Sequence, residues 1–320
     1  MLRKFLFLLF LITLGSNIHS EELKNCEWQN KKGTPCISIN KTSNTSAYSE
    51  KSVNKIVISK EDIVQSGAID VNDVLGIING IDLKQNGQRG QLTSLFLRGT
   101  NSNHTLVLLN GIPINDQTST QGLHNFGQDF VKTIQQIEVY KGPNGAHFGP
   151  SAIGGAINFI TAIDYKNNFS IGGLDGKNNS LDVNFTKILE NGWHVNLKGN
   201  KTKSKTASSR YSGKEEDGSK NNQLNFNAEK WISDNLKLSS TLYVRETKTH
   251  YDASSSDETG YADDKMYAIQ TKLTKRTKNE ESFITFHYNN YDREYDESGY
   301  LDEYVSNSAV IKAERKIKKT

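Results

Sequence analysis

Two stretches of the sequence decide the fold: FLRGTNSNHTLVLLNGIPIND at residues 96–116 and IEVYKGPNGAHFGPSAIGGAINFIT at residues 137–161. In both, short apolar runs alternate with glycine-rich corners, a pattern typical of a small, tightly turned α+β domain. From about residue 165 the sequence changes to long alternating segments with almost no proline. The chain is therefore expected to combine a compact domain with an array of strands.

The first twenty residues predict an export signal, residues 1–20. Arg3 and Lys4 supply the positive start, residues 5–14 are apolar, and residues 16–20 are small and polar. The apolar run is too short to cross a bilayer as a helix, which takes ~20 residues. An uncleaved N-terminal anchor is the alternative interpretation.

Composition excludes several classes of function. The net charge is +3, and the charged residues, 23% of the chain, have both signs interspersed, which argues against a nucleic-acid partner. The mean hydropathy of −0.62 suits a soluble protein, but also a large barrel with a wet lumen and polar loops. The sequence has no nucleophile elbow, zinc-protease motif or phosphate-binding loop. Neither enzymatic activity nor an organic cofactor is expected.

Residues 21–52 are rich in Asn, Lys, Ser and Thr and predict a flexible arm with little to bury. Cys26 and Cys36, the two cysteines of the chain, lie in it. An exported protein meets an oxidising compartment, so we expect them to form one disulfide. A metal or redox site is the alternative, although no histidine lies near enough to complete a usual ligand spacing.

Residues 53–163 predict the compact domain. Ser59 to Asp62 resembles a capping box that opens a helical turn, and residues 71–78 predict a short amphipathic helix. Asn110-Gly111 signals a tight turn. Strands are expected at residues 55–59, 92–97, 105–109, 134–140 and 156–160.

Residues 164–320 have a period of two, as when Leu181, Val183 and Phe185 alternate with polar neighbours. We expect about eight strands with one apolar and one polar face, the pattern of a wall between lipid and water. Tight connectors at residues 190–192, 233–235 and 277–279 alternate with long polar ones at 203–221, 252–264 and 292–303. This rhythm predicts part of an antiparallel transmembrane β-barrel. A soluble β-sandwich is the alternative.

The chain resembles the TonB-dependent outer-membrane receptors over residues 53–161. The resemblance rests on VNDVL at 71–75, QNG at 85–87, GQLTS at 90–94, FLRGTN at 96–101, and GP at 142–143 with Gly149 and AIGG at 152–155. Asn101 followed by HTLVLL at 104–109 makes it most similar to the cobalamin transporters of that family. The resemblance implies an α+β plug domain within a barrel in the outer membrane of a Gram-negative bacterium. It also implies TonB-energised import of cobalamin, with a siderophore or haem as the alternative substrate.

The resemblance further implies a short segment that TonB grips by strand addition, through main-chain hydrogen bonds to an extended stretch. Within the arm, only Ile37, Ser38, Ile39 and Asn40 offer such a stretch. They are the candidate TonB box. An ordinary linker is the alternative, and a cysteine at position 36 is unusual beside such a box.

Two glycine-flanked loops are implied as the plug apices that contact substrate. The candidate residues are Gln91, Leu92 and Thr93 in the first loop and Ser119 and Thr120 in the second. Polar, exposed apices would suit a ligand built of amides and a corrin ring. The alternative is that they are only turn residues. Arg98 and Glu138 are expected to be structural.

Calcium is the one cofactor that the resemblance suggests, bound by extracellular loops. Carboxylates on two adjacent loops can converge to supply the six to eight oxygens that calcium takes. Tyr251, Asp252 and Asp263 match the pattern in type and spacing, and Glu215 and Asp217 match it more loosely. Solvated surface charge is the alternative.

The number of strands sets a further expectation. A barrel that holds a plug needs about 22 strands, so eight cannot close around this domain. The chain ends at residues 318–320 without a terminal aromatic residue. We therefore expect an incomplete gene product or a fragment, and an exported fragment that does not transport is an alternative function.

Overall fold

The computed structural model describes residues 55–317 except 88, 120, 144–147, 149–150, 162–166, 175–177, 206–216, 253–259 and 298. The predicted signal, arm, cysteine pair and TonB box lie outside the described residues. Within the described part of the chain, no helix combines the length and apolar character needed to cross a membrane.

A five-stranded sheet forms the centre of the first domain, here called the plug. Its strand order is β1-β6-β7-β4-β5, with bounds Lys55–Ile58 (β1), Gln136–Lys141 (β6), Gly155–Ile160 (β7), Thr105–Leu109 (β4) and Ile112–Pro113 (β5). A separate hairpin pairs Ile81–Gln85 (β2) with Thr93–Leu97 (β3). Among the described residues of the plug there are also three short 3₁₀ turns: Ser102–His104 (η2), Phe126–Gln128 (η3) and Val131–Thr133 (η4).

Local sequence signals set the helices α2 and α3 and the turn between β4 and β5. Ser59 and Asp62 form the predicted capping box at the start of α2 (Lys60–Gln65), and Asp70 caps α3 (Val71–Leu75) in the same way. The helix expected over 71–78 is shorter, because it ends at Gly76. Gly111 has a φ of 86° between β4 and β5, which confirms the tight turn there.

The plug core is apolar and closely packed. Val71 and Leu75 of α3 are fully buried against Leu95 of β3 and against Ile137 and Ile157 of β6 and β7. Each such side chain contributes about 1.5–3 kcal/mol through removal from water.

The edge strand β1 is fastened at its first residue. The Lys55 ammonium lies 2.9 Å from the Glu138 carboxylate, and both side chains are almost fully buried. Glu138 also accepts hydrogen bonds from the Tyr140 hydroxyl at 2.9 Å and the Asn158 amide at 3.0 Å. This confirms a structural role for Glu138, whereas Arg98 is exposed.

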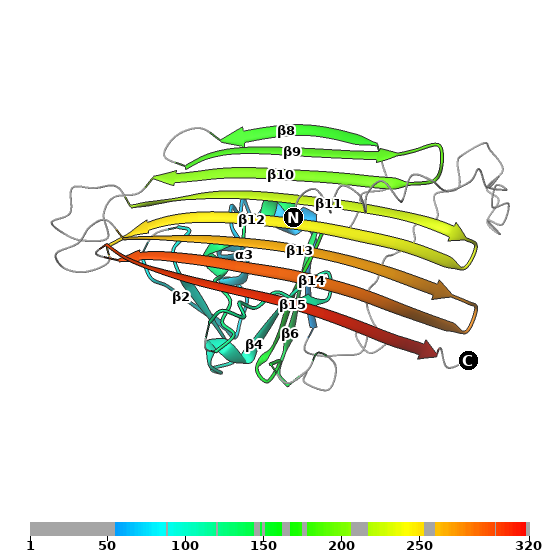
Figure 1. Ribbon diagram of the computed structural model, residues 1–320, viewed down its shortest axis with the longest axis horizontal. Coiled ribbons are helices and arrows are strands. Elements are labelled where there is room, and N and C mark those ends of the chain that lie inside the picture. Colours follow the sequence, from blue (N-terminus) through cyan, green and yellow to red (C-terminus); the bar gives the residue numbers. More distant parts are fainter. Residues whose placement is uncertain are drawn as a thin grey trace. The chain divides into compact units, whose positions relative to one another are not determined.

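Eight antiparallel strands in sequence order make up the second part, here called the wall (Figure 1). Their number confirms the prediction. Their bounds are Asn168–Leu174 (β8), Asn178–Ile188 (β9), His194–Lys205 (β10), Gly218–Ser233 (β11), Leu236–Tyr251 (β12), Gly260–Arg276 (β13), Glu280–Glu297 (β14) and Tyr300–Ile317 (β15).

The two faces of the wall are inverted relative to a soluble protein. One face exposes large apolar side chains, among them Phe169, Ile171, Ile284, Phe286 and Ile311, between 45% and 76% exposed. The other face is polar and mostly buried, with Asn196, Asn221, Asn225, Thr247 and Asn289 at 4% exposed or less. An apolar exterior and a polar, covered interior are the pattern of a membrane β-barrel wall.

Two features of the strands differ from the predictions. The plug strand β2 was not predicted. The three tight turns are confirmed, but the long loop expected over residues 292–303 is wrong, because β14 runs to Glu297 and β15 starts at Tyr300. The charged residues of that segment lie on two paired strands, as when Tyr295 of β14 pairs with Asp302 of β15.

Candidate functional site

A cavity of about 650 Å³ lies between two plug loops and the polar face of β12–β14. From the wall it is lined by Thr249, Tyr251, Asp252, Ala262, Asp264, Tyr291, Arg293, Tyr295 and Glu297. These positions lie at the ends of the strands remote from the three tight turns. In outer-membrane barrels short turns face the periplasm, and the opposite ends of the strands face the outside of the cell.

The first plug loop connects β2 to β3 and reaches the wall at Gly90. A Cβ at Gly90 would lie 2.1 Å from the Ser219 hydroxyl oxygen, and φ is +93° there, so only glycine fits. The Ser219 hydroxyl donates to the Arg89 carbonyl at 3.1 Å, and the Thr249 hydroxyl donates to the Gly90 carbonyl at 3.2 Å. The loop is thus fixed against β11 and β12.

The three candidate residues of this loop differ in their exposure. Leu92 is 48% exposed and lines the cavity. Gln91 also lines it, but its side-chain amide donates to the His250 carbonyl at 3.1 Å. Thr93 is 0% exposed, and its hydroxyl donates to the Gln91 carbonyl at 3.1 Å. A ligand in the cavity would meet Leu92 first.

The second plug loop follows β5 and presents Ser119 to the cavity. Ser119 is held by its own loop: its hydroxyl donates to the Asp116 carbonyl at 3.1 Å and accepts from the Leu123 amide at 2.8 Å. The Asp116 carboxylate accepts from the Thr118 amide and pairs with Arg293 of β14. Thr120 lies outside the described residues.

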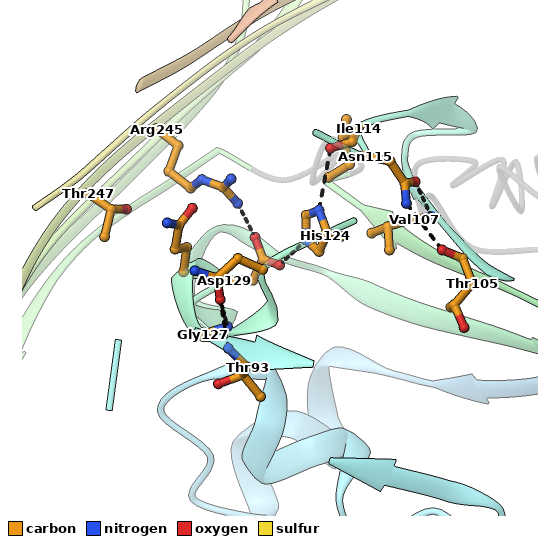
Figure 2. A network of polar contacts seen from close by, with 12 residues as sticks. Thr93, Thr105, Val107, Ile114, Asn115, His124, Gly127, Asp129, Arg245 and Thr247 are labelled. Carbon is orange, nitrogen blue, oxygen red and sulfur yellow. Dashed lines mark hydrogen bonds and ion pairs between the residues drawn. The ribbon is translucent and has the colours of Figure 1, made fainter. Parts of the chain in front are cut away.

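A buried polar network joins the plug to the wall beneath the cavity. Figure 2 shows Arg245 of β12 and His124 of the plug converging on Asp129 from opposite sides. The Arg245 guanidinium donates to one carboxylate oxygen at 2.5 Å, and His124 Nε2 lies 2.5 Å from the other. Arg245 also donates to the Tyr291 hydroxyl at 2.7 Å. All of these side chains are at least 95% buried.

Electrostatics explain how this carboxylate stays charged. Burial alone would raise the pKa of Asp129, but the neighbouring His124 and Arg245 overcome that effect and hold its pKa below the ordinary value. The other ring nitrogen of His124, Nδ1, lies 3.4 Å from the Ile114 carbonyl oxygen.

The plug meets the wall through amides as well. Gln128 donates to the Asp264 carboxylate at 2.6 Å, and its carbonyl accepts from the side chains of Asn221 at 3.0 Å and Gln223 at 3.2 Å. Asn227 donates to the Thr161 carbonyl at 3.1 Å. Hydrogen bonds of this kind exchange readily for bonds to water, each contributing about 0.5–1.5 kcal/mol net.

The candidate calcium ligands are not all brought together. Tyr251 and Asp252 line the cavity, and Asp217, the residue before β11, is buried. Asp263 is adjacent to the cavity-lining Asp264, so alternation along β13 places it on the opposite face of the sheet. In the part of the chain that the structure describes, no group of three or more acidic, His or Cys side chains is arranged to hold a metal ion. Glu215 is not among the described residues.

Most of the cavity's charged residues were missed by sequence reasoning. Asp116, Asp264, Arg293 and Glu297 line it, and Arg245 lies beneath it. The alternation of side chains along each strand could have indicated the two arginines. Arg245 and Arg293 occupy positions on the polar face of their strands, where a charge can be covered by protein.

Residues 48–156 match the family described as the TonB-dependent receptor plug domain. The fold is similar to that of the ferric yersiniabactin uptake receptor FyuA from Yersinia pestis, with 15% identity and a TM-score of 0.71 over 84% of this chain and 46% of that one. The siderophore receptor PirA from Acinetobacter baumannii aligns at 20% identity and 0.64, covering 82% of this chain and 45% of that one.

The ferric enterobactin receptor PfeA from Pseudomonas aeruginosa aligns at 16% identity and a TM-score of 0.64, covering 83% of this chain and 46% of that one. The chain thus spans less than half the length of these three receptors. At these identities the likeness establishes the fold. Residues 48–156 thus match the TonB-dependent receptor plug domain, and the described residues have the fold of the plug and adjoining barrel wall of these receptors.

Proposed function

We propose that this protein is an outer-membrane receptor that binds a large organic metal chelate from outside and imports it with energy delivered through TonB. One observation carries the proposal: the cavity between the plug loops and the polar wall, at the end remote from the tight turns. A siderophore is the first candidate, because the fold relatives above are named as receptors for siderophores or their ferric complexes.

Cobalamin is the second candidate substrate. It is favoured by the sequence itself, through Asn101 and the HTLVLL segment at residues 104–109. The candidate apices Leu92 and Ser119 lie on the cavity surface, where they are available to either type of ligand.

Calcium remains part of the proposal as an ordering ion. Its candidate ligands are Tyr251 and Asp252, which line the cavity, and Asp217 and Glu215 from the preceding connector. If calcium orders the site, removing it with a chelator should weaken binding of the substrate.

Uptake measurements in cells test the function. Cells carrying the protein are expected to accumulate an iron-55-labelled siderophore or labelled cobalamin, and to lose uptake when TonB is deleted. Strand addition needs main-chain hydrogen bonds, so Ile39→Pro in the candidate TonB box should abolish uptake while leaving ligand binding at the cell surface intact.

Ser46→Pro, outside the candidate box but in the same arm, is the matched control and should leave uptake unchanged. Uptake that persists without TonB would remove the energy-coupling part of the proposal. Absence of surface binding for every chelate tried would remove the receptor itself.

A further inference from the structure

The cavity continues into a second hollow of about 380 Å³. The two share Ser119, Arg293, Tyr295 and Glu297, and the second adds Thr118, Asp302 and Tyr304. The joined space, here called the acidic hollow, is bounded by both plug loops and by β12–β15.

Negative charge dominates the lining of the acidic hollow. Its carboxylates are Asp116, Asp252, Asp264, Glu297 and Asp302, and among the described lining residues Arg293 is the one cation. That guanidinium is already engaged on both sides: it contacts the Asp116 carboxylate, and its Nε lies 3.1 Å from the Asp264 carboxylate. The arginine therefore organises two carboxylates and has little positive charge to offer an incoming anion.

Four tyrosine rings also belong to the lining. Tyr251, Tyr291, Tyr295 and Tyr304 line the acidic hollow. The rings of Tyr295 and Tyr304 lie edge to face, 6.5 Å apart, and the Tyr251 hydroxyl donates to the Glu297 carboxylate at 2.8 Å. Ring faces attract cations, and carboxylates beside them accept hydrogen bonds from N–H donors. The two features favour the same kind of ligand.

A concave surface with low-dielectric walls concentrates the field of like charges and selects ligands by sign. Building on the function proposed above, we propose that the ligand of the acidic hollow is cationic or neutral and rich in amine or amide N–H groups, and that strongly anionic catecholate complexes are disfavoured. The hollow thus selects for a chelate with basic or amide-bearing arms.

The sign of the field can be measured without knowing the ligand. Leu92→Cys, in a Cys26→Ser, Cys36→Ser background, places one thiol at the cavity surface of the protein purified in detergent micelles. Its reaction rates with a cationic and an anionic methanethiosulfonate reagent are compared with those of a free thiol. We expect the ratio of the cationic to the anionic reaction rate to be at least about fivefold higher at this cysteine than at the free thiol. High salt should reduce this difference.

Glu297→Gln in that background should reduce the preference by about twofold or more. Asp296→Asn is the matched control, because Asp296 is the neighbouring acid on the opposite face of β14, and it should leave the ratio unchanged. A ratio equal to that of the free thiol, or one favouring the anionic reagent, overturns the inference.

Equilibrium binding then separates this inference from the proposed function. The probes are cationic ferrioxamine B, neutral cyanocobalamin and an anionic ferric tris-catecholate. Tighter binding of the cationic or neutral probe, weakened about fivefold by Glu297→Gln, supports the inference. Tighter binding of the catecholate overturns it while leaving the receptor function standing. If the cysteine at position 92 prefers the cationic reagent but none of the three probes binds, the proposed receptor function is contradicted. The negative sign of the field in the acidic hollow is then still established.

Discussion

The ion pair between Arg245 and Asp129 is expected to hold the plug in place, and its two halves are expected to contribute unequally. The side chains are 1% and 4% exposed, and the guanidinium lies 2.5 Å from the carboxylate. Breaking a buried pair by removing one partner costs about 3–5 kcal/mol, because the remaining charge stays buried.

The structure predicts which half costs more. Arg245→Met leaves the Asp129 carboxylate with His124 still at 2.5 Å, so we expect a loss near the lower limit, about 3 kcal/mol. Asp129→Asn leaves a buried guanidinium whose remaining hydrogen bond is to a neutral tyrosine, and it also removes the partner of His124. That loss should approach about 5 kcal/mol.

Hydrogen exchange measures both losses. In detergent micelles, the opening free energy of peptides from β6 and β7 should fall by these amounts, and the double variant should lose less than the sum of the two. Lys237→Met is the control, because Lys237 of β12 pairs with Glu229 of β11 within the wall. Losses below about 1 kcal/mol, or a larger loss for Arg245→Met than for Asp129→Asn, would refute the reasoning.

Four shorter predictions follow from other contacts. Because the pKa of Asp129 is lowered in the folded protein, the stability that Asp129 gives the plug should be complete above about pH 4. That stability should be lost only as the pH falls through the lowered pKa. Weaker hydrogen-exchange protection of the plug at pH 5 than at pH 8 would contradict this. Gly90→Ala should reduce ligand affinity, because the new Cβ would collide with Ser219 and because φ is positive at this position. Adding Ser219→Gly should remove the collision and recover part of the affinity, while the positive φ still costs about 1–2 kcal/mol. Phe286→Lys, on the apolar outer face, should lower the folded fraction in lipid vesicles by up to about 2–4 kcal/mol, measured by heat-modifiable gel mobility; a neutral effect would argue against lipid contact. Asp252→Asn should abolish any strengthening of ligand binding by calcium if Asp252 is a ligand, and unchanged calcium dependence would exclude it.

Local patterns predicted much of the fold. The wall was predictable because the alternation at Leu181, Val183 and Phe185 follows directly from the geometry of a strand. The cap at Ser59 and the turn at Asn110-Gly111 are likewise encoded within a few residues. The segment at 292–303 misled because charge suggests a loop, although here the charges lie on a paired ribbon.

The site was less predictable, because its parts converge from distant segments. The family resemblance implied Leu92 and Ser119, and both line the cavity. Nothing local connects Asp129 with Arg245, which are 116 residues apart, or Asp116 with Arg293, which are 177 apart. These pairs form only when the plug packs against the wall. The alternation of side chains along the strands could have shown which arginines face inward, but it could not have identified their partners.

The attachment of β1 has a mechanical consequence. This strand pairs with β6 at only four positions, and the first of them, Lys55, carries the ammonium that meets Glu138. Tension applied to the preceding chain would load that contact before any hydrogen bond further along the strand. Below the force that separates Lys55 from Glu138 the domain would resist a steady pull. Above that force, only three further residue pairs would hold β1 to β6. A steadily increasing pull would therefore detach the strand abruptly once the first contact breaks.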